Sequence, residues 1–320
     1  MFCADNGKCL VRNGSLHMNI QSAVPDGPVR VNVYRPSQTL EGYLTFFYAV
    51  EADGPLEDFL YPEWGNVRFA RSGAWSVDMP GFYPPGRQER HLFGPTDRPG
   101  KVETAGGRLF GFGLTPVGWH RLFGAHAGEM ANRVVPLGSR LGISDEELHK
   151  WVIEASDDLV LVHCFEELIA SLITQGPPIG GSVLAVDRAF RLRPRTVAEF
   201  ACSAGLTDRT LHRVCLRSFG FAPKRLLRLQ RFLDALGHMR SAVGEPIIEA
   251  LGLAYYDAAH FYHDFRTFMG MTPREYLSAP RPLMAAAAKA QMSAGITLSF
   301  ELPPTINAAS EHTSPNFRLG

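Results

Sequence analysis

The chain has 320 residues, of which 45% are hydrophobic and 20% charged, and its basic and acidic residues are equal in number. This length suits about two domains, and the composition is ample for ordinary hydrophobic cores. Five scattered cysteines without a Cys-x-x-Cys pair favour a reducing compartment over a disulfide framework.

Residues 1–30 carry Gly, Asn, Ser and Pro without a clear period, and we expect a flexible tail there. The pattern up to about residue 141 is that of short strands between Gly and Pro turns. The strand candidates are 43–50, which the turn Asp53-Gly54-Pro55 ends, then 67–69, 75–77 and 109–114. Gly73 is interpreted as a turn between strands, and the pair Gly106-Gly107 as a turn or as glycines within a strand.

A helical period begins after Gly142. Ser144, with Glu147 three residues later, has the spacing of a capping box, and a second helix is expected from about Ser156 to Thr174. Residues 31–180 would thus form a β-rich domain that ends in two helices. Because the apolar residues of these helices spread beyond one narrow stripe, the pair 145–174 is a candidate homodimer contact.

No segment predicts a membrane protein. The most apolar helical stretch, 159–173, contains a histidine and two glutamates and is too short to span a bilayer. The N-terminus has no charged segment followed by an apolar one, so no signal peptide is expected. We therefore expect a cytoplasmic protein.

The C-terminal third is basic. From Asp187 to Arg281 there are 15 Lys and Arg residues against 9 Asp and Glu, whereas the rest of the chain has 17 against 23. A basic module on an acidic body is typical of a DNA-binding domain joined to a different domain. We assign residues 183–281 to this module and expect residues 282–320 to form a disordered tail without packed structure.

The basic module contains a repeat. Residues 197–227 are echoed by residues 248–277, and each copy has the pattern of a helix, a turn and a second helix. The apolar row Leu211, Cys215 and Phe219 corresponds to Phe261, Phe265 and Met269, and Gly220-x-x-Pro223 corresponds to Gly270-x-x-Pro273. Such self-similarity indicates a duplicated unit, which is most simply explained as a DNA reader with two helix-turn-helix heads.

The second helix of the first copy, from about Asp208 to Ser218, has two different faces. Its arginines recur every four residues, each two positions from the apolar row and therefore about 200° around the helix. Thr207 or Asp208 is a candidate N-cap, and Gly205 allows the positive φ that a tight turn needs. An exposed arginine row can contact guanine or phosphates, although on its own it also fits a merely solvated face. The DNA-contact candidates in this row are Arg209, Arg213 and Arg217.

The second copy offers fewer basic side chains. Its outer face is expected to carry Asp264 and the DNA-contact candidates His260, Tyr262, His263 and Arg266. The spacing of the two histidines also suits a metal pair, but no Cys or third ligand is near, so neither a metal nor a cofactor is expected. A periodic helix at 225–237 would hold the copies at a fixed distance, and successive major grooves lie about 34 Å apart.

At these residues the chain resembles the DNA-binding domain of AraC-type (AraC/XylS family) transcription regulators. The likeness rests on Ala201-x-x-x-Gly205-Leu-Thr-x-Arg209, Arg228-x-x-Arg231-Phe and Tyr255-x-Asp257-x-x-His260-Phe261. It implies two helix-turn-helix units joined by a long helix, with recognition helices at 207–218 and 257–267. The resemblance also makes Thr207 and His212 DNA-contact candidates, because it implies base-reading positions at Thr207, Arg209, His212 and Arg213. It also implies double-stranded DNA as the partner, with RNA polymerase and a second copy of the chain as further candidates. Tyr61-Pro-x-x-Gly65 and residues 107–116 are similar to the sensor region of one AraC-type subgroup.

The β-rich segment is aromatic, with arginines interleaved. One interpretation is an effector pocket with apolar walls and a few charged groups; the other is an aromatic β core with solvated arginines. The aromatic residues are Phe46, Phe47, Tyr48, Trp64, Phe69, Trp75, Phe82, Tyr83, Phe93, Phe110, Phe112 and Trp119, and the basic residues are Arg68, Arg71, Arg87, Arg90 and His91.

The sequence thus predicts an α+β chain that acts as a sequence-specific transcription regulator and not as an enzyme. Its N-terminal domain would respond to a small-molecule effector of unknown identity or to self-association. No nucleophile elbow, His-Glu-x-x-His or phosphate-loop motif is present. The alternatives are a regulator without a small ligand, and a β-domain enzyme whose helical C-terminus mediates protein contacts.

Overall fold

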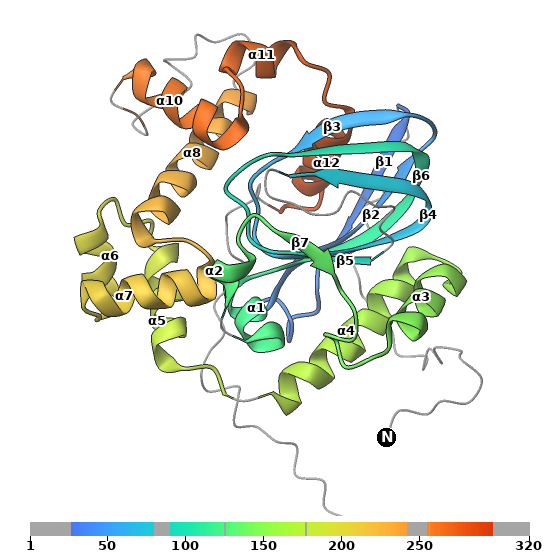
Figure 1. The fold of residues 1–320 in the computed structure, drawn as a ribbon, viewed down its shortest axis with the longest axis horizontal. Coiled ribbons are helices and arrows are strands. Elements are labelled where there is room, and N and C mark those ends of the chain that lie inside the picture. Colours follow the sequence, from blue (N-terminus) through green and yellow to red (C-terminus); the bar gives the residue numbers. More distant parts are fainter. Residues whose placement is uncertain are drawn as a thin grey trace, which may run out of the picture.

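The computed structural model describes residues 27–79, 90–124, 126–176, 178–241, 255 and 257–296. Two regions lie side by side: the β region, residues 27–176, and the helical region, residues 178–278 (Figure 1). The chain is therefore α+β, as the sequence predicts. Most of the predicted N-terminal tail, residues 1–26, and the end of the predicted C-terminal tail, residues 297–320, fall outside these ranges.

The strands of the β region form one antiparallel sheet in the order β1-β2-β6-β4-β5-β7, with β3 also paired to β6. The strands are β1 (Val29–Tyr34), β2 (Leu44–Ala52), β3 (Leu56–Leu60), β4 (Asn66–Asp78), β5 (Arg90–Phe93), β6 (Gly100–Leu114) and β7 (Val134–Pro136). The strands predicted at 43–50 and 109–114 are confirmed as β2 and the second half of β6, and the turn predicted at Asp53–Pro55 connects β2 to β3. No separate strand was predicted at β1, β3, β5 or β7.

The interpretation of Gly73 as a turn is wrong, because β4 continues through it, and of the two alternatives for Gly106-Gly107 the strand is correct, because β6 continues through both. Gly73 and Gly107 are register partners at an irregularity in the β4–β6 pairing, and their φ angles are 73° and 133°. A Cβ atom at Gly73 would lie 1.9 Å from the carbonyl oxygen of Gly106. The glycines therefore let two long strands bend together at a β-bulge instead of ending them.

The two faces of β6 differ because its sequence alternates Phe110-Gly111-Phe112-Gly113. The phenylalanines are fully buried in the larger hydrophobic core, on the face that α4 covers. The glycines lie on the opposite face, where a Cβ atom at Gly111 would come within 2.5 Å of the Tyr48 hydroxyl. Since side chains alternate along a strand, this pattern fills one face of the sheet and leaves the other face hollow.

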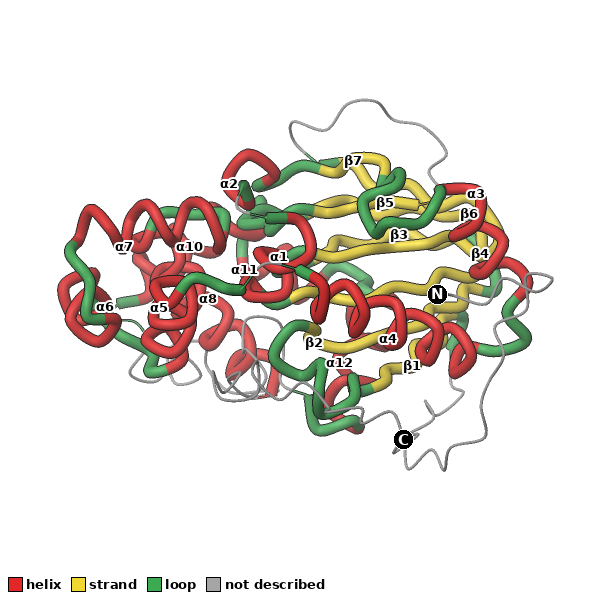
Figure 2. Tube along the Cα trace, turned by 90° about the horizontal axis from the view of Figure 1, so that it is seen from below, coloured by secondary structure: helices red, strands yellow, loops and turns green. Residues whose placement is uncertain are grey.

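Four helices complete the β region: α1 (Pro116–Phe123), α2 (Ala127–Met130), α3 (Asp145–Glu154) and α4 (Asp158–Gln175). The predicted helix pair is confirmed: the Ser144 hydroxyl caps α3, and Asp157 caps α4. Helix α4 runs along the sheet (Figure 2), and the Phe165 ring lies 4.9 Å from Phe69 and 5.7 Å from Phe110. This packing within the chain accounts for the apolar residues that suggested a dimer contact.

The cysteines differ in their surroundings. Cys202 is exposed on the outer face of its short helix, whereas Cys215 is buried. Cys164 is buried in α4 and is disulfide-bonded. Spacing along a sequence does not show which segments meet in space, so the scatter of the cysteines was no guide to this bond.

The helical region begins with α5 (Gly181–Arg191) and α6 (Val197–Ala204). Helix α7 (Asp208–Val214) continues as a π-helical turn, η1 (Cys215–Phe219), and α8 (Pro223–Ser241), α10 (Ala258–Met269) and α11 (Pro273–Ser278) follow. The helices predicted at 208–218 and 225–237 are confirmed as α7 with η1 and as part of α8. The first helix of the second copy, residues 248–254, lies outside the described residues. Among the helices that are described, none has the length and apolar character needed to cross a bilayer.

The prediction of a disordered tail from residue 282 is wrong for its first part, which forms helix α12 (Pro282–Ser293). This helix returns from the helical region to the sheet and packs against β1 and β3 (Figures 1 and 2). Leu283, Ala288 and Ala290 are buried there. The Ala-rich run looked too weak to form a core of its own, but small residues allow a helix to lie close to the hollow face of the sheet.

Candidate nucleic-acid interface and ligand cavity

Helix α7 has the two faces that the sequence predicts. Gly205 ends α6 in the left-handed conformation with φ 64°, and the Thr207 hydroxyl then accepts a hydrogen bond from the Thr210 N–H at 3.3 Å. Leu211 and Cys215 are fully buried. The candidates on the other face are all exposed: Thr207, Arg209, His212, Arg213 and Arg217. The local sequence thus directs a basic row away from the core.

Helix α10 repeats this arrangement. Its row of Phe261, Phe265 and Met269 is fully buried, as is the equivalent row of the first copy apart from 1% of Phe219. Both copies end in a left-handed glycine, Gly220 with φ 87° and Gly270 with φ 68°. The candidates on the outer face of α10 are exposed: His260, Tyr262, His263 and Arg266.

Asp264 was expected on the outer face of α10 but is fully buried. Three residues after Phe261, it falls on the same side of the helix and faces α8. Its carboxylate lies 2.5 Å from Arg228 Nη2 and 3.3 Å from Arg231 Nη2, and it accepts a hydrogen bond from the Tyr255 hydroxyl at 2.9 Å. Burial alone would raise the pKa of Asp264, but these partners outweigh it and lower the pKa below its ordinary value.

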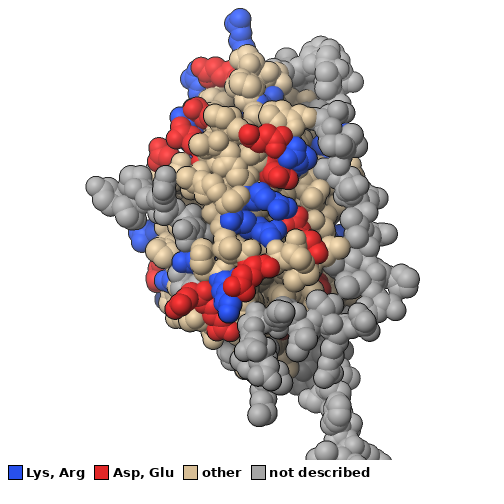
Figure 3. Space-filling model, turned by 90° about the vertical axis from the view of Figure 1, so that its right-hand side faces the viewer, with Lys and Arg blue, Asp and Glu red and all other residues tan. Residues whose placement is uncertain are grey.

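The basic side chains of α7 differ from most of the charged surface. On the face of the β region that points away from the helical region, acidic and basic side chains intermingle (Figure 3). Pairs such as Lys101 with Glu57 and Glu103 neutralise charge on the strands. Arg209 and Arg213, in contrast, have no ion-pair partner within the described part of the chain, so their charge is available to a ligand.

The π-helical turn η1, which continues α7, is joined to the β region. The Arg217 carbonyl, in η1, accepts a hydrogen bond from the His126 N–H at 2.9 Å, and the Ser218 hydroxyl lies 3.3 Å from His120 Nδ1. Burial and two neighbouring arginines lower the pKa of His120, which favours a neutral imidazole. Arg225 at the start of α8 also pairs with Asp97 at 2.5 Å. The position of α7 therefore depends on the β region.

A cavity of about 380 Å³ occupies the hollow face of the sheet beneath α12. The aromatic residues divide between the lining of this cavity and the larger core. Phe46, Tyr48, Trp75 and Phe93 line the cavity, Trp64 lines it and also belongs to the larger core, and Phe47, Phe69, Phe110, Phe112 and Trp119 belong to that core. Of the basic candidates, Arg68 and His91 line the cavity, and Arg71 instead pairs with Asp158. Phe82, Tyr83 and Arg87 lie outside the described residues.

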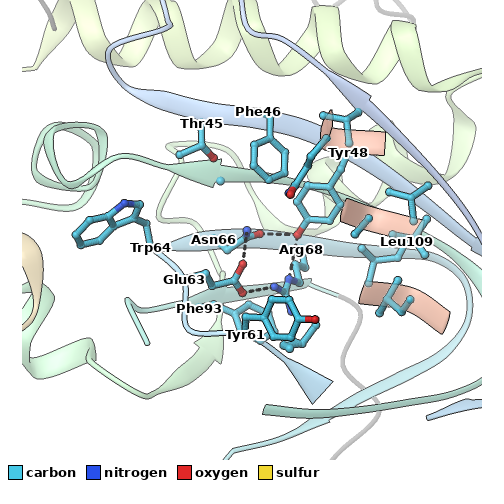
Figure 4. A pocket seen from close by; sticks show the side chains of 18 of the residues that line it. Thr45, Phe46, Tyr48, Tyr61, Glu63, Trp64, Asn66, Arg68, Phe93 and Leu109 are labelled. Atoms are coloured by element: carbon cyan, nitrogen blue, oxygen red, sulfur yellow. Dashed lines mark hydrogen bonds and ion pairs between the residues drawn. The ribbon is translucent and has the colours of Figure 1, made fainter. Parts of the chain in front are cut away.

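One wall of the cavity carries the polar cluster, which consists of Tyr48, Glu63, Asn66 and Arg68 (Figure 4). Arg68 forms an ion pair with Glu63 and donates through Nε to the Tyr48 hydroxyl at 3.0 Å. That hydroxyl donates in turn to Asn66 Oδ1 at 2.6 Å. Burial raises the pKa of Tyr48 to about 12, so it stays neutral. Although burial alone would lower it, the neighbouring Glu63 and Tyr48 raise the pKa of Arg68, which keeps its charge.

Residues 200–279 match a family model described as a helix-turn-helix domain. The helical region thus contains a DNA-binding domain of the AraC type, the kind that transcription regulators carry. No curated protein sequence matches the chain.

Solved structures of low similarity include two of ToxT from Vibrio cholerae and one of the AraC-like transcriptional activator CuxR. One ToxT structure has 13% identity and a TM-score of 0.39, covering 78% of this chain and 97% of ToxT. The ToxT structure with a bound unsaturated fatty acid has 12% identity and a TM-score of 0.38, covering 79% and 95%. CuxR has 14% identity and a TM-score of 0.25, covering 68% and 86%. Likeness at this level carries no argument about a ligand.

Proposed function

We propose that this chain is a sequence-specific transcription regulator in which α7 and α10 read successive major grooves of duplex DNA. The observation that carries the proposal is the exposed basic row on α7, on the side opposite a fully buried apolar row. Helix α10 repeats the arrangement, and α8 connects the two units. Thr207, Arg209, His212, Arg213 and Arg217 would contact DNA from α7, and His260, Tyr262, His263 and Arg266 from α10.

We propose further that an effector in the cavity controls DNA binding. Helix α12 lies over the cavity and directly follows α11, and η1 contacts α1 and α2. A molecule that changes the packing of the β region would thus change the placement of both recognition helices. In this role the chain would act in the cytoplasm, with RNA polymerase and a second copy of itself as candidate partners. In the same proposal, residues 31–180 form the domain that responds to the effector and residues 183–281 form the DNA-binding domain.

The affinity of the full chain for a generic duplex is expected to fall steeply with salt. Each phosphate that a basic side chain neutralises contributes a slope of roughly −0.9 in log affinity against log salt. Fluorescence anisotropy with a labelled duplex measures this slope. A β-domain enzyme with a helical protein-contact module would show no such slope, so a flat series would refute the proposal.

Replacing Arg213 by alanine is expected to weaken binding to a selected site by about 1–3 kcal/mol. The site is obtained by selecting bound fragments of genomic DNA. Lys150→Ala removes the same charge from an exposed position on α3 and should leave the affinity unchanged. An equal loss for Arg213→Ala on every sequence would assign Arg213 to the phosphate backbone, and no loss would remove it from the interface.

A further inference from the structure

The charges on the cavity wall balance. Arg35 and Arg68 line it together with Glu41, Glu63 and the imidazole of His91. Arg68 and Glu63 are in direct ionic contact. A carboxylate ligand that took over Arg68 would leave Glu63 without its counter-charge in a partly buried position, and an ammonium ligand would meet the guanidinium. The wall therefore disfavours a ligand of either charge.

The cavity still offers a site for one hydrogen bond. Arg68 uses Nε and Nη2 within the polar cluster, whereas its Nη1 has no acceptor among the described residues. A neutral oxygen could accept from Nη1 without breaking the pair with Glu63. Most of the remaining wall is apolar, and Val33, Phe46 and Leu109 contribute to it.

Helix α12 supplies one side of the cavity through Met284, Ala287 and Gln291. It is held in place at both ends. The Met284 N–H donates to the buried Asp58 carboxylate at 2.9 Å, and Arg35 donates to two carbonyls just after the helix at 2.8 Å. A ligand beneath α12 would thus touch the segment that directly follows the helix-turn-helix domain.

We infer that the cavity accepts an uncharged, largely apolar molecule with one hydrogen-bonding oxygen, such as an alcohol, ketone or amide, and that this molecule contacts α12. The inference rests on the proposed control by an effector and names the class of that effector. The volume of about 380 Å³ lies in the range usual for small-molecule sites.

The test uses the full chain and three probes with the same alkyl body: decanol below its solubility limit, and decanoate and decylammonium below their micelle concentrations. Burial raises the pKa of Glu63, although Arg68 opposes this shift, so the calorimetric titration is done at about pH 8. There decanol should bind with an affinity about tenfold higher than either charged probe. Glu63→Gln leaves the charge of Arg68 uncompensated, so this variant should prefer decanoate. That reversal would not follow from mere damage to the fold.

Two variants of α12 locate the site. Ala287→Trp fills the cavity from its lining and should abolish decanol binding, whereas Ala285→Trp, on the exposed side of the same helix, should leave it intact. Preference for decanoate in the unmodified chain, no binding of any probe, or equal behaviour of the two tryptophan variants would each overturn the inference. DNA anisotropy on the same preparations tests the proposed regulator separately. Absence of DNA binding would refute the regulator, whereas failure of the probe tests with DNA binding intact would refute only the inferred class of ligand.

Discussion

Replacing Asp264 by alanine is expected to destabilise the helical region by about 2–4 kcal/mol. The substitution leaves Arg228 and Arg231 facing an apolar junction between α8 and α10 without their counter-charge. Breaking a buried pair costs about 3–5 kcal/mol, and the estimate is lower because these arginine side chains are still 27% and 34% exposed. Urea unfolding followed by helical circular dichroism measures the loss.

The pH dependence provides the control. Asp264→Asn keeps the shape of the side chain and removes its charge. Because the folded-state pKa of Asp264 is lowered, its charge stabilises the fold above the unfolded-state pKa of about 3.9 and stops doing so as the pH falls through the lower folded value. The unmodified chain should therefore exceed Asp264→Asn in stability at neutral pH and converge with it in acid. A difference that does not depend on pH would contradict the ion-pair account.

Replacing Phe165 by alanine is expected to destabilise the β region by about 3–5 kcal/mol. The Phe165 ring is fully buried and contacts three phenylalanines of β4 and β6. Its removal would leave a cavity between α4 and the sheet, and the surrounding side chains could not move enough to fill it. The midpoint of thermal or urea unfolding of the β region measures the effect.

Ile153 on α3 is the matched control, since it is 45% exposed. Ile153→Ala should change stability by no more than about 0.5 kcal/mol. If Phe165→Ala proved equally mild, α4 would not be packed as described, and its apolar face would again be a candidate surface for a second copy of the chain.

The helical region could be predicted well because its signals are local. The N-cap at Thr207, the turn at Gly205 and the rows of α7 that repeat every four residues are all defined within a dozen neighbouring residues. The β region could be predicted only in part. Whether Gly73 ends a strand or bends it depends on Gly106 and Gly107, more than thirty residues away, and nothing in the local pattern carries that information.

The same distinction applies to the two sites. The exposed candidates on α7 and α10 follow from helical periodicity, whereas the cavity is assembled from strands far apart in the sequence and from α12. Asp264 was misplaced because a charged residue was assumed to face solvent. Its position three residues after Phe261 and the arginines of α8 were the available signals. The alternation of Phe110 and Phe112 with glycine could likewise have identified the hollow face of the sheet.

Helix α12 makes the helix-turn-helix domain a segment anchored at both of its ends. Only residues 279–281 separate α11 from α12, and three residues span at most about 10–11 Å. With α12 seated on the sheet, the domain can pivot between two fixed points but cannot swing away. Release of α12 would remove one of these anchors. The helix-turn-helix domain would then be attached to the β region at one end only and could move freely instead of rotating about an axis.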